Sequence, residues 1–377
     1  MKSRCRRRWS LALAIACLTA CPAAVQAAEK AAAPNGGANI QAGEDEEWKQ
    51  IDAAAKRAVA YLLSQQEDDG SIDEAGRHKT TMTALAIVAM CSVGHKLTDQ
   101  TKEGETLRRA LAYVLDPERQ DPDGYFGRRD QAKMYGQGIV TLMLAEVLGM
   151  GVDEQLDRVF RERLRKAIDL ILRAQAVPKK NKKEEGGWRY EPNSQDTDLS
   201  VTSWQLISLR AAKNAGMEVP KEAIDKAVAY VKRCYFSRRE KDGAAETGYF
   251  TYTPNDRTMR FGSAAGGLLT LQICGEYDAP EVKGAADYFL AYEIPEVEGK
   301  EYFYYGMYYY AQAMRQRGGK YADHARKVVR DILLKLQEKD GSWHPGKKDS
   351  AGGIVYVTSL SLLSLSIHYY YLPIYQR

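Results

Sequence analysis

The hydrophobic positions from about residue 48 onward recur with helical spacing and form two alternating kinds of segment. The first kind is apolar on one face only, as in residues 58–65, which predicts an amphipathic helix with one face in water. The second kind is apolar on most faces and rich in small residues, as in residues 83–90, which predicts a buried helix. No span reads as a confident strand, and residues 249–252 are expected to form at most a short extended loop.

The two kinds of segment alternate six times, so the chain from residue 48 onward reads as six helical hairpins. A turn within the hairpin combines Gly with an aromatic or large apolar residue, since Gly accepts the positive φ of a tight turn. These turns are residues 69–72, 123–126, 186–188, 248–250 and 340–343, and the fifth hairpin lacks one. The equivalent positions of the apolar helices are Thr83, Gln137, Thr202, Ala264, Met307 and Thr358.

The last apolar helix indicates that the six hairpins close on themselves. It runs through Leu365 and Ile367 and has no polar face that could cap an open superhelix. We therefore expect an all-α fold, an (α/α)6 toroid formed as a single domain by residues 48–377. The apolar helices would form its inner ring and the amphipathic helices its outer ring.

The first residues predict export. A basic start, from Lys2 to Arg8, precedes an apolar run over residues 9–20 that is too short to span a membrane. Residues 1–27 are expected to be a signal peptide; alternatively, residues 1–20 are a lipoprotein signal that leaves a lipid on Cys21. Both routes place the protein in the periplasm, the envelope or the medium, with Cys21 as the expected membrane anchor in the second. Residues 28–47 are expected to be a flexible linker.

Charge and cysteine usage exclude two classes of protein. The 377-residue chain has a net charge of +4, but the leader carries five bases and no acid, so the remainder is close to neutral. Nothing therefore suggests a nucleic-acid-binding surface. The cysteines beyond the leader lie in or beside apolar helices, which favours buried thiols over a disulfide framework. They are Cys91, Cys234 and Cys274.

The pattern of Gln followed by Gly and Trp resembles the prenyltransferase/squalene oxidase repeat of squalene-hopene cyclases and protein prenyltransferase β subunits. It is clearest at Gln175 with Gly187 and Trp188, and at Gln337 with Trp343. The resemblance extends over residues 48–377 and implies a terpenoid-cyclase-like toroid with a central cavity. It does not by itself imply an activity.

Two residues are catalytic candidates by this resemblance. Class II terpene cyclases protonate an alkene with the middle Asp of an Asp-x-Asp-Asp motif, and residues 196–199 here read Asp-Thr-Asp-Leu. Asp198 holds the protonating position, with Asp196 beside it. In a ring closed in chain order, Asp198 would lie between Lys133 and Arg260, whose charges would lower its carboxyl pKa, the wrong direction for an acid catalyst. The alternative is a rim ion pair and helix cap.

The resemblance also allows a test for a zinc site. Protein prenyltransferases bind zinc through an Asp-x-Cys pair and a later His, and the corresponding positions here are Tyr305, Met307 and Val357. None of these side chains supplies a zinc ligand. We therefore expect no protein prenyltransferase activity, no metal and no cofactor.

Aromatic residues are expected around the centre of the ring. Residues 302–310 contain six Tyr and one Phe, and a helical run of nine residues covers every face. Such rings suit isoprenoid chains or sugar faces, or they fill the centre and pack it shut. With basic residues near the helix starts, the candidate cavity residues are Trp204, Tyr135, Tyr305, Tyr308, Tyr309, Lys79, Lys133 and Arg260. His78 is the one histidine near an inner-helix start.

Three functions follow from these observations. The main expectation is a protein that binds an apolar or isoprenoid-like ligand in its cavity. An enzyme is the first alternative, either cyclase-like with Asp198 as the acid or a lyase on a glycan. In the lyase, Lys79, Lys133 or Arg260 would neutralise a uronate and a Tyr would act as base. The second alternative is an envelope scaffold that binds other proteins.

Overall fold

The computed structural model describes residues 37–74, 76–150, 153–238, 247–294, 302–346, 352–369 and 371–376. The chain divides into two compact units, Met1–Trp48 and Lys49–Arg377. Helix α1 spans Gly37–Ser64, so it begins inside the segment expected to be a linker. The predicted leader and Cys21 lie outside the described residues. No described helix is both long and apolar enough to cross a membrane.

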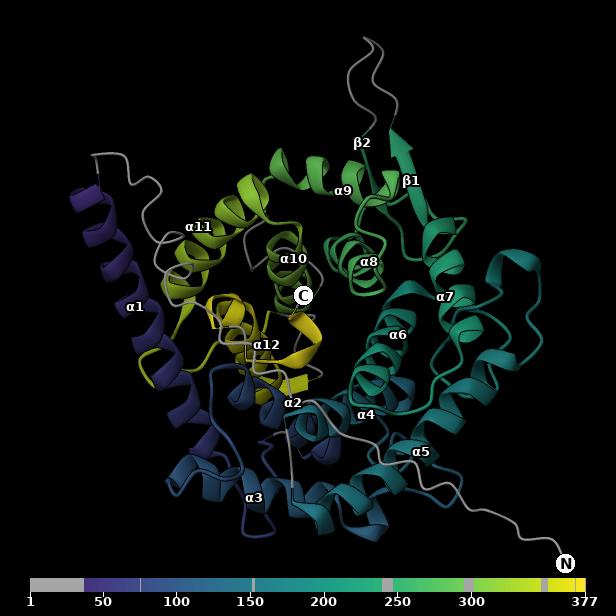
Figure 1. Cartoon of the computed structure of the whole chain (residues 1–377), viewed down its shortest axis with the longest axis horizontal. Coiled ribbons are helices and arrows are strands. Elements are labelled where there is room, and N and C mark those ends of the chain that lie inside the picture. The colour runs from purple at the N-terminus through teal and green to yellow at the C-terminus, as the bar shows by residue number, and fades with distance from the viewer. Residues whose placement is uncertain are drawn as a thin grey trace, which may run out of the picture. The chain divides into compact units, whose positions relative to one another are not determined.

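Six helices of the second unit form a closed inner ring (Figure 1). Each contacts the next, and the last contacts the first. Almost every residue of these helices is buried, as expected for segments that are apolar on most faces. They are α2 (Lys79–Ser92), α4 (Lys133–Gly149), α6 (Leu199–Asn214), α8 (Phe261–Ile273), α10 (Phe303–Arg317) and α12 (Gly353–Leu365).

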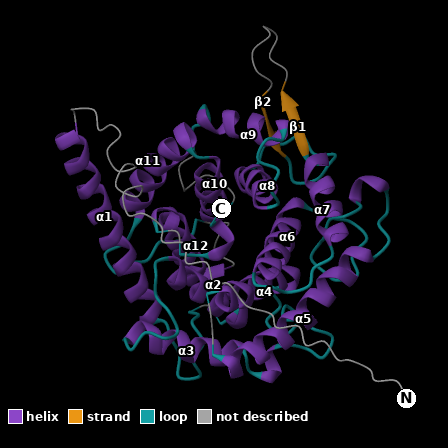
Figure 2. Ribbon diagram, in the orientation of Figure 1, coloured by secondary structure: helices purple, strands orange, loops and turns teal. Residues whose placement is uncertain are grey.

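The amphipathic helices pack outside this ring (Figure 2). Each buries one stripe, such as Phe160, Leu164 and Ile171 of α5, and exposes charged residues on the other side. The all-α toroid with an apolar inner and an amphipathic outer ring is thereby confirmed. The outer helices after α1 are α3 (Lys102–Val114), α5 (Glu154–Ala176), α7 (Lys221–Arg233), α9 (Pro280–Leu290) and α11 (Gly319–Leu336).

A recurring Gln joins one repeat to the next. In the third repeat the amide of Gln175 donates to the carbonyl of Gly186 in its own turn and to that of Ala223 in the next outer helix, both at 2.9 Å. Gln66, Gln120 and Gln337 make the same pair of hydrogen bonds in the first, second and sixth repeats. The repeat is therefore defined by a bridge between neighbours as well as by its helices.

In four repeats the large apolar residue of the Gly turn is hydrogen-bonded through its backbone N–H to a side chain of the inner helix. The backbone N–H of Trp188 donates to Thr202 Oγ1 at 3.0 Å, and its indole N–H donates to the carbonyl of Ile171 at 2.8 Å. Thr83, Gln137 and Thr358 accept the equivalent backbone hydrogen bond in three other repeats. Four of the six register positions deduced from the sequence thus hold a turn against the inner ring; Ala264 and Met307 make no equivalent side-chain bond among the described residues.

The described residues contain one small sheet, which the sequence did not predict. Strands β1 (Tyr235–Arg238) and β2 (Thr247–Phe250) pair antiparallel at the end of α7. The expectation of at most an extended loop at residues 249–252 is therefore wrong for its first half. Phe250 is buried and its ring packs edge-on against Tyr235, so an aromatic pair across the strands stabilises the hairpin.

The C-terminal residues close one end of the inner ring. A 3-10 turn, η6 (Pro373–Tyr375), contacts α4 and α6, and Figure 1 shows the chain ending inside the ring. The N–H of Ile374 donates to the carboxyl of Glu146 at 3.1 Å. Glu146 is 1% exposed, and burial raises its pKa to about 8. The hydroxyls of Tyr375 and Tyr308 are hydrogen-bonded to each other, so the segment is also fixed to α10.

Candidate functional site

A cavity of about 640 Å³ lies at the N-terminal end of the inner ring. It is lined by residues from the first two turns of the six inner helices and by the loops that precede them. Seven aromatic side chains contribute to its wall: Tyr135, Tyr190, Trp204, Tyr252, Tyr302, Tyr305 and Tyr356. The cavity is therefore a feature of the whole ring, with each repeat contributing to it.

The backbone around this cavity is strained. Among the described residues, three that are not glycine have positive φ, and all three line the cavity. They are Gln131 (φ 59°), Lys133 (φ 56°) and Tyr302 (φ 57°). The left-handed region costs a residue with a Cβ about 1–2 kcal/mol, and such strain gathers at functional sites. Because all three strained residues line this cavity, we take the cavity as the candidate site.

The electrostatic field at this end of the ring favours an anion. All six inner helices begin here, and a helix N-terminus carries roughly half a positive charge from its peptide dipoles. The carboxylates of Asp130, Asp198 and Glu74 bond to the first turns of α2, α6 and α12, so the N-termini without an acidic cap are those of α4, α8 and α10. Lys133 and Arg260 add two full charges to the wall. Each is also paired at the rim, Lys133 with Glu191 at 3.0 Å and Arg260 with Asp256. None of the described lining residues is Asp or Glu.

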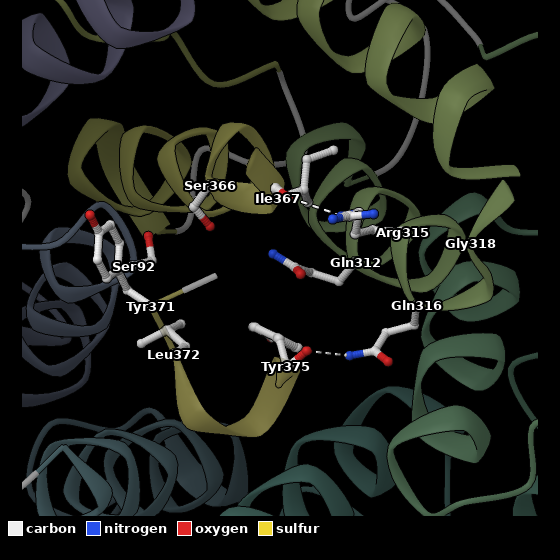
Figure 3. Close-up of a pocket in the computed structure, with 10 residues that line it drawn as sticks. All are labelled: Ser92, Gln312, Arg315, Gln316, Gly318, Ser366, Ile367, Tyr371, Leu372 and Tyr375. Atoms are coloured by element: carbon white, nitrogen blue, oxygen red, sulfur yellow. Dashed lines mark hydrogen bonds between the residues drawn. The ribbon is translucent and has the colours of Figure 1, made fainter. Parts of the chain in front are cut away.

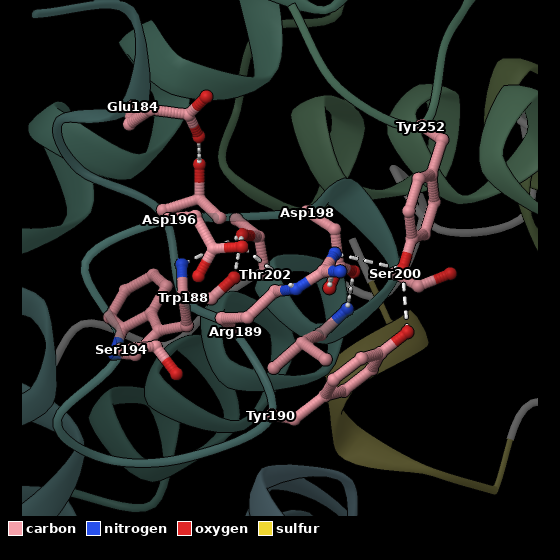
Figure 4. A network of polar contacts seen from close by, with 12 residues as sticks. Glu184, Trp188, Arg189, Tyr190, Ser194, Asp196, Asp198, Ser200, Thr202 and Tyr252 are labelled. Carbon is pink, nitrogen blue, oxygen red and sulfur yellow. Dashed lines mark hydrogen bonds and ion pairs between the residues drawn. The ribbon is translucent and has the colours of Figure 1, made fainter. Parts of the chain in front are cut away.

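A polar network joins the loops that precede α6 and α8 (Figure 4). Arg189 Nη1 donates to Asp198 Oδ2 at 2.9 Å and to the hydroxyl of Tyr252 at 3.0 Å. The hydroxyls of Tyr252 and Tyr190 are 2.7 Å apart, and the Arg189 guanidinium lies 4.4 Å from the centre of the Tyr190 ring. This network fixes two phenols in the cavity wall.

Asp198 supports the network from below and does not line the cavity. Its side chain is fully buried; Oδ1 accepts the N–H of Val201 at 2.8 Å, so the residue caps α6. Burial raises its pKa to about 6, against the effect of Val201 and Arg189. The expected lowering by Lys133 and Arg260 is therefore wrong, because desolvation dominates and the cation that contacts this carboxyl is Arg189. Both carboxyl oxygens are already occupied by these partners.

His78 presents one ring nitrogen without a described partner. It precedes α2 and lines the cavity, with Nδ1 2.6 Å from the carbonyl oxygen of Asp130. Because a carbonyl only accepts, the proton of the neutral imidazole lies on Nδ1. The lone pair is therefore on Nε2, where it can accept a proton.

The predicted site residues separate into two groups. Trp204, Tyr135, Tyr305, Lys133 and Arg260 line the cavity. The other predicted residues do not line it: Asp198, Asp196, Tyr308, Tyr309 and Lys79. Asp196 is half exposed and pairs with Arg189 at 3.4 Å. Tyr308 and Tyr309 pack beneath the cavity with almost no exposure, and Lys79 pairs with Asp69 at 3.9 Å outside the cavity.

Three residues of the site were not predicted from the sequence: Arg189, Tyr190 and Tyr252. A signal for both phenols was present, because Tyr190 and Tyr252 each lie two residues after the aromatic residue of a Gly turn, Trp188 or Phe250. That shared offset places each of them in the loop that leads to an inner helix, nine residues before the start of α6 or α8. The partner role of Arg189 could not be deduced, because it depends on the path of the loop.

A second cavity, of about 180 Å³, lies at the C-terminal segment (Figure 3). Its wall includes Gln312, Arg315 and Gln316 of α10 together with Tyr375. Gln316 Nε2 donates to the Tyr375 carbonyl at 2.9 Å and Arg315 Nε to the Ile367 carbonyl at 3.1 Å. This cavity shares no described lining residue with the larger one. Among the described residues no cluster of His, Cys, Asp and Glu could hold a metal ion.

No protein-family model matches the chain, and no curated protein matches its sequence. Among solved structures the fold is similar to the GH76A α-1,6-mannanase from Salegentibacter sp. HEL1_6. The TM-score is 0.59 at 10% identity, over 84% of this chain and 98% of that one. An inactive variant of that enzyme in complex with α-1,6-mannotetrose gives the same TM-score at 9% identity and the same coverage. At these identities the likeness establishes the fold.

These neighbours correct the main functional expectation. The sequence suggested an apolar or isoprenoid-like ligand, whereas the two similar structures are of an α-1,6-mannanase, one of them in complex with α-1,6-mannotetrose. That expectation is therefore wrong. The composition of the cavity wall is compatible with the correction, because hydroxyl groups and two cations line it together with aromatic side chains.

Proposed function

We propose that this protein binds an acidic glycan in the 640 Å³ cavity and cleaves it by β-elimination. One observation carries the proposal: aromatic faces, two cations and the N-termini of α4, α8 and α10, which have no acidic cap, converge on a cavity without Asp or Glu among its described lining residues. Aromatic rings stack on sugar faces, and the positive field favours a carboxylate on the sugar. The glycan-active toroids of similar fold support the choice of ligand class.

The wall supports elimination better than hydrolysis. Most glycosidases need two carboxyl groups on either side of the bond, about 5–9.5 Å apart. The described wall offers none, and Asp198 is held beneath it by Val201 and Arg189. Elimination next to a uronate instead needs a cation to neutralise the carboxylate, a proton acceptor and a proton donor.

The residues of the wall supply these three roles. Arg260 neutralises the uronate carboxylate, and His78 Nε2 takes the proton from the carbon beside it. The electrons of that C–H bond form a C=C bond as the C–O bond to the neighbouring sugar breaks. Tyr252 gives its proton to the departing oxygen; burial raises the pKa of its phenol, so the proton is present at neutral pH. Arg189, bonded to that hydroxyl, stabilises the phenolate left behind.

We propose further that the protein acts outside the cytoplasm, where polysaccharides occur. The predicted leader supports this location. We also propose a relation to the prenyltransferase/squalene oxidase repeat proteins, which the recurring Gln and Gly turns support. Neither bears on the chemistry of the cavity.

The test is an assay on pectate, alginate, hyaluronate and heparin, with α-1,6-mannan as the neutral control. We expect at least one acidic polymer to yield products with the ultraviolet absorbance of an unsaturated uronate, and mannan to yield none. His78→Gln and Tyr252→Phe should each reduce the rate by about 10²-fold or more. His95→Gln and Tyr292→Phe, outside the cavity, are the matched controls. New reducing ends without that absorbance, or cleavage of mannan alone, would refute the proposal.

A further inference from the structure

The cavity has a floor of buried aromatic rings. Trp204 and Tyr305 line its lower wall and are 1% and 7% exposed. Beneath them, Tyr308 stacks on Trp204 with a centroid distance of 5.8 Å and an interplanar angle of 12°. The hydroxyl of Tyr305 donates to that of Tyr309 at 3.4 Å, and Tyr309 is fully buried. The rings of α10 therefore fill the middle of the toroid and leave the cavity above them.

The C-terminal segment seals the ring below this floor. Tyr375 is bonded to Tyr308 by its hydroxyl and to Gln316 by its carbonyl, while Ile374 is bonded to Glu146. These contacts reach α10 and α4, and η6 also packs on α6. The described residues thus separate the large cavity from the small one at the opposite end.

The cavity is deep as well as closed at its floor. Along α4 its wall extends from Lys133 to Ile139, six residue steps that rise about 9 Å. The half-exposed Lys133 and Tyr302 lie at the outer end of the wall. A sugar in contact with Trp204 therefore has space for its chain in one direction only, toward the helix N-termini.

We infer that the cavity accepts the end of a glycan chain and excludes internal sugars from the position beside Trp204. This inference rests on the proposed function and specifies its substrate: the terminal sugar lies on the floor formed by Trp204 and Tyr305, and the rest of the chain leaves past Lys133 and Tyr302. An internal sugar carries a chain on both sides, and one of them would have to pass through the packed rings of α10. Cleavage would then release products of one short length from a single end.

The number of protein molecules bound per chain tests the inference. The inactive His78→Gln protein is titrated by calorimetry against size-fractionated chains of about 5, 20 and 80 sugars of whichever acidic polymer the wild-type protein binds. One bound protein per chain at every length is expected. A number that rises with chain length would overturn the inference and leave the proposed function intact. Failure to bind any of the four acidic polymers overturns both.

Product analysis with the wild-type protein gives an independent result. We expect a single short product from the first minutes, with little loss of viscosity; a mixture of sizes and a rapid fall in viscosity would contradict the inference. Trp204→Ala removes part of the floor, so its shortest product should be longer than that of the wild type. Trp204→Phe keeps an aromatic floor and should retain the original product. Circular dichroism and the melting temperature establish that both variants are folded.

Discussion

Gln337 Nε2 lies 2.9 Å from the carbonyl oxygen of Ala54, so the sixth repeat is hydrogen-bonded to the first. The same amide donates to Gly341 of its own turn. Gln337→Ala leaves both carbonyls without this donor and should lower the free energy of unfolding by about 2 kcal/mol. Urea denaturation measures the loss. Gln65→Ala, which removes only a local contact with Ser64, should change stability by less than about 0.5 kcal/mol.

The turn glycines allow a comparison of backbone strain with steric contact. Gly124 and Gly275 both have positive φ, 96° and 90°. A Cβ on Gly124 would lie 2.1 Å from the carbonyl oxygen of Lys166, whereas one on Gly275 would meet nothing within 4 Å. Gly275→Ala should therefore cost only the backbone strain of about 1–2 kcal/mol.

Gly124→Ala should cost at least about 2 kcal/mol more, because α5 must move away from the turn. Thermal unfolding of the two variants measures the difference. Equal losses in both proteins would mean that the contact between this turn and α5 is not rigid.

Glu146 makes stability depend on pH. Its pKa is about 8 in the folded protein against 4.5 ordinarily, so the folded state holds a proton that the unfolded chain has released. The stabilising effect is complete below about pH 4.5 and is lost as the pH rises toward 8. The neighbouring Cys91, Tyr308 and Tyr375 stay neutral over this range, because burial raises the pKa of each.

Glu146→Gln should remove this dependence. The variant can still accept the N–H of Ile374, and at pH 8 it should be more stable than the wild type by an amount on the order of 4 kcal/mol. Urea denaturation at pH 5, 7 and 8.5 gives both curves. If the two proteins lost stability in parallel with rising pH, the slope would have to come from other groups.

Substitutions of Asp198 distinguish a support from an acid catalyst. Asn can still cap α6, so Asp198→Ala should be less stable than Asp198→Asn by about 1 kcal/mol. Both variants release Arg189 from its buried partner and should slow glycan cleavage about tenfold through Tyr252. A loss of 10³-fold in kcat for the Asn variant, at unchanged stability and KM, would instead assign direct proton transfer to Asp198.

The sequence predicted the repeats well because each rests on local chemistry. Gly70 or Gly341 marks a turn by its conformational freedom, and the apolar run after it identifies a buried helix. The hairpin at Tyr235 was not predicted because its pairs join residues that lie 9 to 15 positions apart in the sequence. The buried positions of Tyr308 and Tyr309 were missed because helical periodicity gives the faces of α10 and not the depth at which the ring is filled.

The ligand was mispredicted for a related reason. Aromatic residues such as Trp204 fit either a hydrocarbon chain or a sugar, and the sequence alone does not show which polar groups lie between them. Only the folded ring brings Tyr190 together with Tyr252 and Arg260, which lie more than 60 residues further along the chain.

The Gln bridges are distributed unevenly around the circle. They link the first four repeats in succession and tie the sixth back to the first, but the described residues of the fourth and fifth repeats contain none. A closed ring has no terminal repeat that can unfold first, so local unfolding should begin at the interface between repeats that has the fewest stabilising bonds. That interface lies around α9, where amide protons should exchange soonest and where a protease should first cut the intact protein.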